Sequence, residues 1–128
     1  MKASSLLIVD DQAAVRKLVG LVARTLGFSS LEAQNGWEAL QVLASHHSEI
    51  AMVIIDVDMP VMDGIESARR MKGLDPKMPI ILMSGRFPDL TQFHGCRFVS
   101  KPFEIAELAD AIRQTVAAAT ARPVPLRQ

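Results

Sequence analysis

Closely spaced carboxylates are the first feature of this sequence that could do chemistry. In the stretch VIIDVDMPVMDG, Asp56 and Asp58 directly follow an apolar run, and Asp10 and Asp11 follow LLIV near the N-terminus. Carboxylates held close together repel one another unless a cation neutralises them. Oxygen ligands without a His or Cys cluster suit a hard ion such as Mg²⁺. The residue types therefore suggest phosphoryl chemistry.

Short apolar runs predict the strands that would position these acids. LLIVD (residues 6–10), AMVIID (51–56) and MPIILMS (78–84) are continuous and apolar, which is typical of strands buried on both faces of a sheet. Two briefer strands are predicted in SSLEAQNG, from residue 29, and in RFVSKPF, from residue 97. Three of the runs end in a polar residue that could be reactive.

Apolar residues at helical spacing predict helices between the strands. The first helix carries its apolar face from Val15 to Leu26 and stops at Gly27. WEALQVLAS follows with Asn35 as its cap, IESARRM forms a short helix, and a last helix runs over residues 105–116. Two prolines in ARPVPLRQ prevent its continuation. We expect one domain over residues 1–121 and a flexible tail over 122–128.

Strands that alternate with helices predict an α/β fold, a doubly wound parallel sheet with helices on both faces. Such sheets bind ligands at the carboxyl ends of their strands. The residues at those predicted ends are Asp10, Asp11, Asp56, Ser84 and Lys101. Taken singly, each is an ordinary turn residue, helix cap or solvated charge. As a set they would converge on one edge, where a divalent cation could bind.

Five motifs in order resemble the receiver domain of two-component response regulators. They are VDD (9–11), QNGWEAL (34–40), DVDMPVMDG (56–64), LMSG (82–85) and KPF (101–103). The likeness extends to about residue 119. It implies a flavodoxin-like fold whose five parallel strands are ordered 2-1-3-4-5. It also implies a histidine kinase or a histidine phosphotransfer protein as the donor of a phosphoryl group.

The resemblance assigns roles to single residues. Asp56 matches the phosphoacceptor, a carboxylate that attacks a phosphohistidine and becomes an aspartyl phosphate. Asp10 and Asp11 match the acidic pair that holds Mg²⁺, with Mn²⁺ as a substitute; Asp11 would bind directly and Asp10 through water. Asp56 and the backbone carbonyl of Asp58 would complete the ligands. Lys101 would pair with a phosphoryl oxygen, and the family pattern implies a cis peptide bond between Lys101 and Pro102.

A switch follows from the same resemblance. Ser84 matches the hydroxyl that binds another phosphoryl oxygen, and Gly85 leaves room for the group. Movement of Ser84 would open space for Phe98, although Phe98 is equally well a half-buried strand residue. Asp58 could orient or repel the water that attacks the acyl phosphate, with Arg86 as its charge partner. We therefore expect Asp58 and Arg86 to set the lifetime of the phosphorylated state.

The segment GRFPDLTQFHGCR (85–97) departs from the family pattern, because it is short and has no helical stripe. We expect the fourth helix of the family to be shortened or missing. Phe87, Leu90 and Phe93 would fold over the sheet as part of the core or offer an apolar docking patch. The sequence therefore does not identify the surface that contacts a downstream protein.

Bulk composition limits the classes of partner. The chain has 128 residues, and 14 basic residues balance 14 acidic ones, so no charge excess favours nucleic acid or an anionic membrane. No apolar run approaches membrane-spanning length, and the single cysteine favours a reducing compartment such as the cytoplasm. We expect a monomer or weak dimer that acts by contact on a downstream protein.

Two alternatives to a phosphorylated receiver remain. One is a binding module that keeps the fold without phosphorylation. The other is an enzyme, a phosphatase of the haloacid-dehalogenase type, which also has a DxD motif. Such phosphatases carry the nucleophile on the first core strand with metal-binding acids downstream, whereas Asp10 and Asp11 lie upstream of Asp56. The order of motifs favours a receiver that is not an enzyme.

Overall fold

The computed structural model describes residues 3–85 and 96–120. The described elements, in chain order, are β1 (Ser5–Val9), α1 (Ala13–Thr25), β2 (Ser29–Ala33), α2 (Gly36–His46), the short 3₁₀ helix η1 (His47–Glu49), β3 (Ile50–Asp56), α3 (Gly64–Leu74), β4 (Ile80–Ser84), β5 (Cys96–Ser100) and α4 (Ile105–Thr120). Strands and helices alternate as far as β4. The predicted strands and helices are confirmed, with ends that move by one to a few residues.

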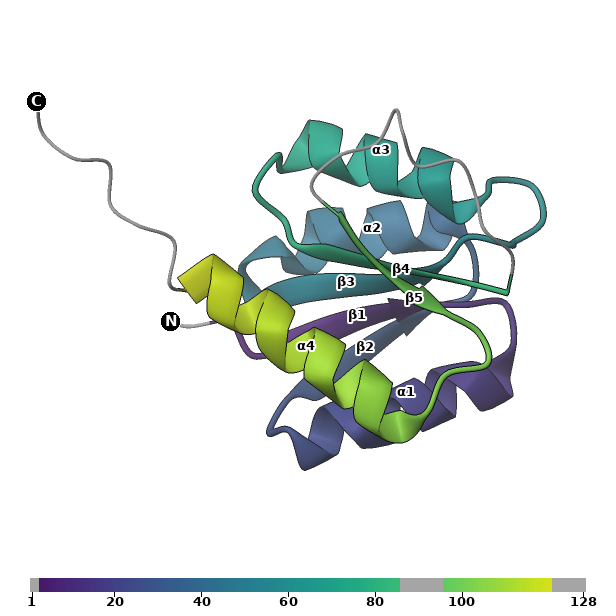
Figure 1. Cartoon of the computed structure of the whole chain (residues 1–128). Helices are drawn as coiled ribbons and strands as arrows, with labels where there is room; N and C mark the ends of the chain where they lie inside the picture. Colours follow the sequence, from purple (N-terminus) through teal and green to yellow (C-terminus); the bar gives the residue numbers. More distant parts are fainter. Residues whose placement is uncertain (1–2, 86–95, 121–128) are drawn as a thin grey trace, which may run out of the picture.

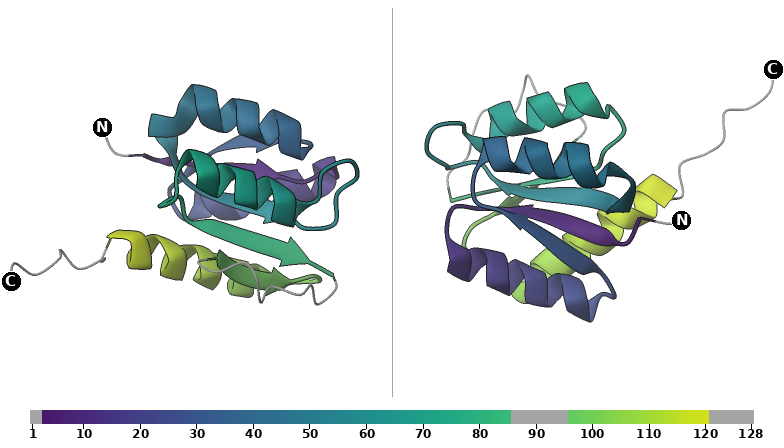
Figure 2. Two further views of the ribbon diagram at one scale, coloured as in Figure 1. Left: turned by 90° about the horizontal axis from the view of Figure 1, so that it is seen from above. Right: turned by 180° about the vertical axis from the view of Figure 1, so that it is seen from behind.

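The strands form one parallel sheet in the order β2-β1-β3-β4-β5. Helices α1 and α4 cover one face and α2 and α3 cover the other, which gives three layers (Figures 1 and 2). This is the predicted flavodoxin-like arrangement. We call the side of the sheet at which the parallel strands end the carboxyl edge, and the opposite side, at which they begin, the amino edge. Neither name refers to the outermost strands, which we call edge strands.

A continuous apolar core lies on each face of the sheet. Strand β1 shows why, since all five of its side chains are buried and alternate between the two faces. Leu7 and Val9 pack with α2 and α3, whereas Leu6 and Ile8 pack with α1 and α4. Successive side chains of a strand point to opposite faces of the sheet. A run of apolar residues is therefore fully buried only when helices cover both faces.

Two helix ends explain why the chain reverses where it does. Asn35 caps α2 by accepting a hydrogen bond from the Glu38 backbone N–H at 2.8 Å, and Glu38 accepts one from the Gln34 N–H at 2.7 Å. The pair is a capping box. Gly27 ends the first helical segment with a φ of +91°, a backbone conformation that glycine adopts without a side-chain clash. Both predicted signals are confirmed.

Some expectations concern parts of the chain that the structure does not describe. The shortened or missing fourth helix, Arg86, Phe87, Leu90 and Phe93 all fall within residues 86–95, and the predicted tail falls within 121–128; these stay predictions. The 11 residues between β4 and β5 run from 85 to 95. In the described ranges, none of the helices has the length and apolar character needed to span a membrane.

Candidate functional site

Three carboxylates meet at the carboxyl edge. Val9 pairs with Ile55 in the register of β1 and β3, so the next residues along the two strands, Asp10 and Asp56, lie side by side. Oxygen atoms of Asp10, Asp11 and Asp56 all lie within 4.8 Å of one another. Asp10 is fully buried and Asp56 is 4% exposed, whereas Asp11 is exposed to solvent. The tertiary structure therefore assembles the predicted acids.

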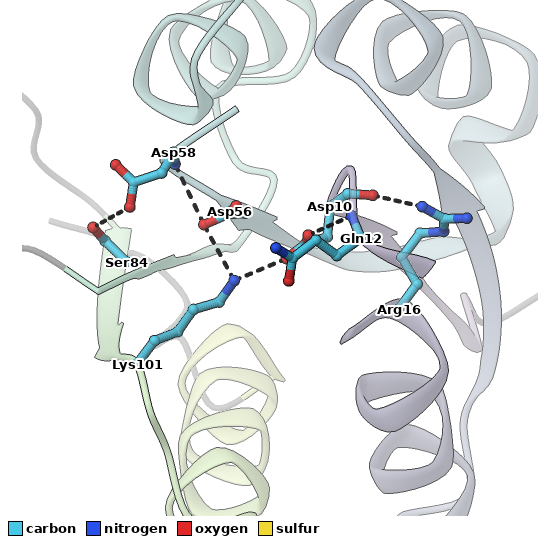
Figure 3. A network of polar contacts seen from close by, with 7 residues as sticks. All are labelled: Asp10, Gln12, Arg16, Asp56, Asp58, Ser84 and Lys101. Carbon is cyan, nitrogen blue, oxygen red and sulfur yellow. Dashed lines mark hydrogen bonds and ion pairs between the residues drawn. The ribbon is translucent and has the colours of Figure 1, made fainter. Parts of the chain in front are cut away.

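Lys101 supplies positive charge to this cluster from the segment after β5. Its Nζ donates a hydrogen bond to Asp10 Oδ2 at 3.0 Å and lies 3.4 Å from Asp56 Oδ1 (Figure 3). Burial alone would lower the pKa of Lys101, but its contacts with the two carboxylates outweigh burial and raise the pKa above the ordinary value. The Lys101–Pro102 peptide bond is cis, as the family pattern implies.

Asp56 is held in an environment that disfavours its charge. Burial raises the pKa of Asp56, Lys101 lowers it, and the neighbouring Asp10 carboxylate raises it again, so that the net shift is upward. Its Oδ1 also accepts a hydrogen bond from the Asp58 backbone N–H at 3.3 Å. A buried anion in this position gains from any further cation.

Ser84 and Asp58 lie on the side of Asp56 that faces away from Asp10 (Figure 3). Ser84 ends β4 and is fully buried, and its Oγ donates a hydrogen bond to Asp58 Oδ2 at 2.9 Å. Asp58 belongs to the loop after β3. The predicted phosphoryl-binding hydroxyl is thus near the predicted acceptor, but here it contacts a fourth carboxylate, that of Asp58.

A glycine lets the loop after β3 fold back onto the acceptor. Gly64 begins α3, and its N–H donates to the Val57 carbonyl oxygen at 2.9 Å. A Cβ at residue 64 would lie 2.2 Å from the backbone oxygen of Asp56 and 2.7 Å from Val57 Cα. The backbones of Gly64 and Asp56 therefore approach closely, and no other residue type fits at residue 64 without displacing the Asp56 backbone.

The donor set fits a hard divalent cation. Three carboxylates, from Asp10, Asp11 and Asp56, lie close together, and Lys101 is the one lysine that contacts two of them among the described residues. The clustered ligand atoms are carboxylate oxygens, the type that Mg²⁺ prefers, with one exposed acid that leaves access from solvent. Asp10, Asp11 and Asp56 are the residues that would hold the ion.

The remaining predicted residues have mixed outcomes. Phe98 is partly buried and packs against the core on the α2 and α3 face, which is compatible with both expectations for it. A Cβ at Gly85 would meet only the Lys101 carbonyl oxygen, at 3.9 Å. Arg86, the proposed partner of Asp58, lies outside the described residues.

Sequence reasoning missed Arg16 and Glu32. Arg16 Nη1 donates a hydrogen bond to the backbone oxygen of Asp10 at 2.7 Å, and its Nε pairs with Glu32 Oε1 at 2.8 Å. The available signal was a basic residue in the first turns of the helix that follows the acidic pair. Nothing in the local sequence links it to Glu32, which lies 16 residues further on in β2.

The fold agrees with what comparison with known proteins finds. The protein-family model of the response regulator receiver domain matches residues 6–113 of this chain. The chain belongs to this family.

Relatives include short and long proteins. The chain is 31% identical over 119 residues to sporulation initiation phosphotransferase F of Bacillus subtilis, a match that covers 89% of this chain and 94% of the relative. It is 41% identical over 81 residues to the autoinducer 1 sensor kinase/phosphatase LuxN of Vibrio campbellii, a match that covers 63% of this chain but only 9% of that protein. The activity named for the longer relative is therefore not assigned to this chain.

Solved structures show the same fold. A chain of the CheX–CheY–BeF3–Mg²⁺ complex from Borrelia burgdorferi superimposes with a TM-score of 0.79 at 26% identity, over 93% of this chain and 90% of that one. The similarity extends over nearly the whole chain and includes all five strands in the family's order.

Proposed function

We propose that Asp56 accepts a phosphoryl group from the phosphohistidine of a histidine kinase or a histidine phosphotransfer protein. The observation that carries this proposal is the cluster of Asp10, Asp11 and Asp56, with oxygens within 4.8 Å of one another beside a single lysine. The chain's membership of the receiver family supports it. We place the protein in the cytoplasm, where such donors are phosphorylated from ATP.

The transfer step needs a nucleophile, a leaving group and charge neutralisation. A carboxylate oxygen of Asp56 forms a bond to phosphorus as the P–N bond to the donor's imidazole breaks, and the imidazole nitrogen takes the electron pair and a proton. Lys101 Nζ, 3.4 Å from Asp56, is within reach of a phosphoryl oxygen on that residue. When bound, Mg²⁺ would offset negative charge on the phosphoryl oxygens. Asp10, Asp11, Asp56 and the backbone carbonyl of Asp58 would hold it, or Mn²⁺ in its place.

Ser84 would change partner after phosphorylation. Its hydroxyl donates to Asp58 in the unphosphorylated chain, so binding a phosphoryl oxygen requires this 2.9 Å hydrogen bond to break. Movement of Ser84, coupled to the half-buried Phe98 on β5, would alter the surface offered to a downstream protein. We also propose that Asp58 tunes phosphoryl lifetime, because its backbone N–H donates to the acceptor Asp56 and its carboxylate accepts from the Ser84 hydroxyl.

Two other functions stay in competition. A binding module that is not phosphorylated would keep the same fold, and the relatives' names, which include a phosphotransferase and a sensor kinase/phosphatase, favour phosphoryl transfer over it. The phosphatase alternative is not supported by the strand order, since Asp56 lies on β3 and the acidic pair follows β1. We propose that the protein is a signalling receiver and not an enzyme.

The test is intact mass after incubation with Mg²⁺ and a small acyl phosphate. We expect one added phosphoryl group on the wild type, lost with chelator and in Asp56→Asn. Asp110→Asn is the matched control, because it makes the same chemical change at an exposed residue of α4. Donor consumption is followed in parallel, so that a short-lived adduct is not missed. A wild type that neither gains the group nor consumes donor would favour the binding module.

A further inference from the structure

Arg16 connects the acidic pair to the edge strand β2. It lies in α1, and its side chain is only 16% exposed. One guanidinium nitrogen donates to the backbone oxygen of Asp10 and another pairs with Glu32, at 2.7 and 2.8 Å (Figure 3 shows the contact with Asp10). A guanidinium has donors in a rigid plane, so two contacts fix its orientation and that of the carbonyl it holds.

The bonded carbonyl belongs to the peptide unit that joins the two acids. Because a peptide unit is planar, holding the carbonyl oxygen of Asp10 also fixes the orientation of the N–Cα bond of Asp11. The backbone N–H of Asp10 donates to the Ala33 oxygen at 3.2 Å, and its two carboxylate oxygens accept from the Gln12 N–H and from Lys101. Asp10 is therefore held at all four of its polar groups.

Asp11 depends on this backbone for its position. Its side chain is exposed, and no hydrogen bond or ion pair holds it within the described part of the chain. Among the residues that the structure describes, the conformation of the loop between β1 and α1 is what directs its carboxylate toward Asp10 and Asp56. Arg16 and Glu32 brace that loop against β2.

We propose that Arg16, anchored by Glu32, is a positioning residue that aims the Asp11 carboxylate into the metal-binding cluster. This inference rests on the proposed Mg²⁺ site. Arg16 does not touch the ion or the phosphoryl group in this scheme; it acts through the peptide unit between Asp10 and Asp11.

Charge and position make opposite predictions for the loss of Arg16. Arg16 carries a positive charge close to a site for a cation, so its removal would strengthen Mg²⁺ binding if charge alone mattered. If Arg16 positions Asp11, its removal weakens binding, because the loop then samples orientations in which Asp11 points to solvent. Loss of a group that orients a metal ligand typically weakens metal affinity 10- to 100-fold.

The test is a Mg²⁺ titration followed in two-dimensional ¹H–¹⁵N NMR spectra of the full chain, which report folding and binding together. We expect Arg16→Met to weaken Mg²⁺ binding by about tenfold. Arg16→Lys should also weaken it, because lysine keeps the charge but cannot hold both Asp10 and Glu32 in one plane. Lys17→Met is the matched control, since it removes the same charge from an exposed neighbour on α1.

The outcomes separate this inference from the proposed function. Equal or tighter binding by Arg16→Met, with wild-type binding intact, would overturn the positioning role and leave the proposed function standing. Wild-type affinity in Arg16→Lys would overturn it as well, and this variant serves alone if Arg16→Met does not fold. A wild type without any Mg²⁺ response would overturn the metal site and the positioning role together.

Discussion

The two edges of the sheet carry charge in different ways. At the carboxyl edge, Asp10 and Asp56 are buried, and a single lysine contacts both. At the amino edge, ionisable side chains lie at or near the surface and are hydrogen-bonded in pairs, as in His46 with Glu49 at 3.0 Å and His47 with Asp75 at 2.8 Å.

This difference separates a functional arrangement of charge from a structural one. Burying like charges side by side costs folding free energy. Such groups are therefore found mostly at functional sites, where the charges take part in binding or chemistry. Paired surface charges contribute little in either direction. Substitutions at the carboxyl edge should therefore have larger and more specific effects than those at the amino edge, and the following experiments test that contrast.

Two glycines of α3 should give effects of opposite sign. A Cβ at Gly64, at the carboxyl edge, would overlap the Asp56 backbone, whereas a Cβ at Gly73 meets nothing within 4 Å. We expect Gly64→Ala to lower the free energy of unfolding by roughly 2–4 kcal/mol. Gly73→Ala should raise it by up to about 1 kcal/mol, because alanine favours a helix. Urea unfolding measures both, and equal effects would contradict the contrast.

Cys96 at the amino edge should react slowly despite its place at the start of an edge strand. Burial raises the pKa of Cys96 to about 11 from an ordinary 9.0, an effect only partly offset by Lys72. At pH 8 its thiolate fraction should be about a hundredfold lower than in the unfolded chain, since each pKa unit is a factor of ten. Alkylation rates with iodoacetamide, compared with and without urea, measure this. Equal rates would show that the thiol is not buried.

Mg²⁺ should stabilise the fold through the carboxyl edge only. At ten times its dissociation constant, the ion should raise the free energy of unfolding by about 1.4 kcal/mol if it binds the native state alone. Asp11→Asn should remove this gain with little effect on the ion-free fold, because Asp11 is exposed. Asp110→Asn is the control and should keep the gain. A Mg²⁺ effect that survives in Asp11→Asn would place the bound ion elsewhere.

The His47–Asp75 pair should have the smallest effect. The hydrogen bond from His47 lowers the pKa of Asp75 in the folded state, with a smaller opposing effect of burial. A lowered pKa gives stability that is present above the ordinary pKa near 3.8 and is lost as pH falls through the folded value. We expect His47→Ala to cost at most about 0.5 kcal/mol at pH 6, and less below pH 3. A cost above 2 kcal/mol would contradict our view of this edge.

The elements and their order could be predicted from the sequence because each follows from a local pattern. Four of the five residues of β1 are apolar, α1 is amphipathic, and Asn35 and Gly27 mark helix ends. The residues at the carboxyl ends of strands were also predictable once the sheet was taken to be parallel. The observed cluster of Asp10, Asp11 and Asp56 confirms that convergence.

Two contacts could not be predicted in the same way. Ser84 and Asp58 are 26 residues apart, and Arg16 and Glu32 are 16 apart; each pair meets only because β-strands from different parts of the chain pack side by side. A surface arginine and a surface glutamate have the same appearance in a sequence whether they pair or not. Their meaning depends on register and on side-chain direction.

The sequence by itself determined the class of fold, the edge that carries the chemistry and the family, because periodicity, turn residues and short motifs act over a few residues. Only the tertiary structure decided the state of the site: Lys101 bridges Asp10 and Asp56, Ser84 donates to Asp58, and Arg16 holds the peptide unit between the two acids. These contacts join side chains that are distant along the chain. Their distances and burial exist only once the sheet has formed, and they set the charge and geometry of the site.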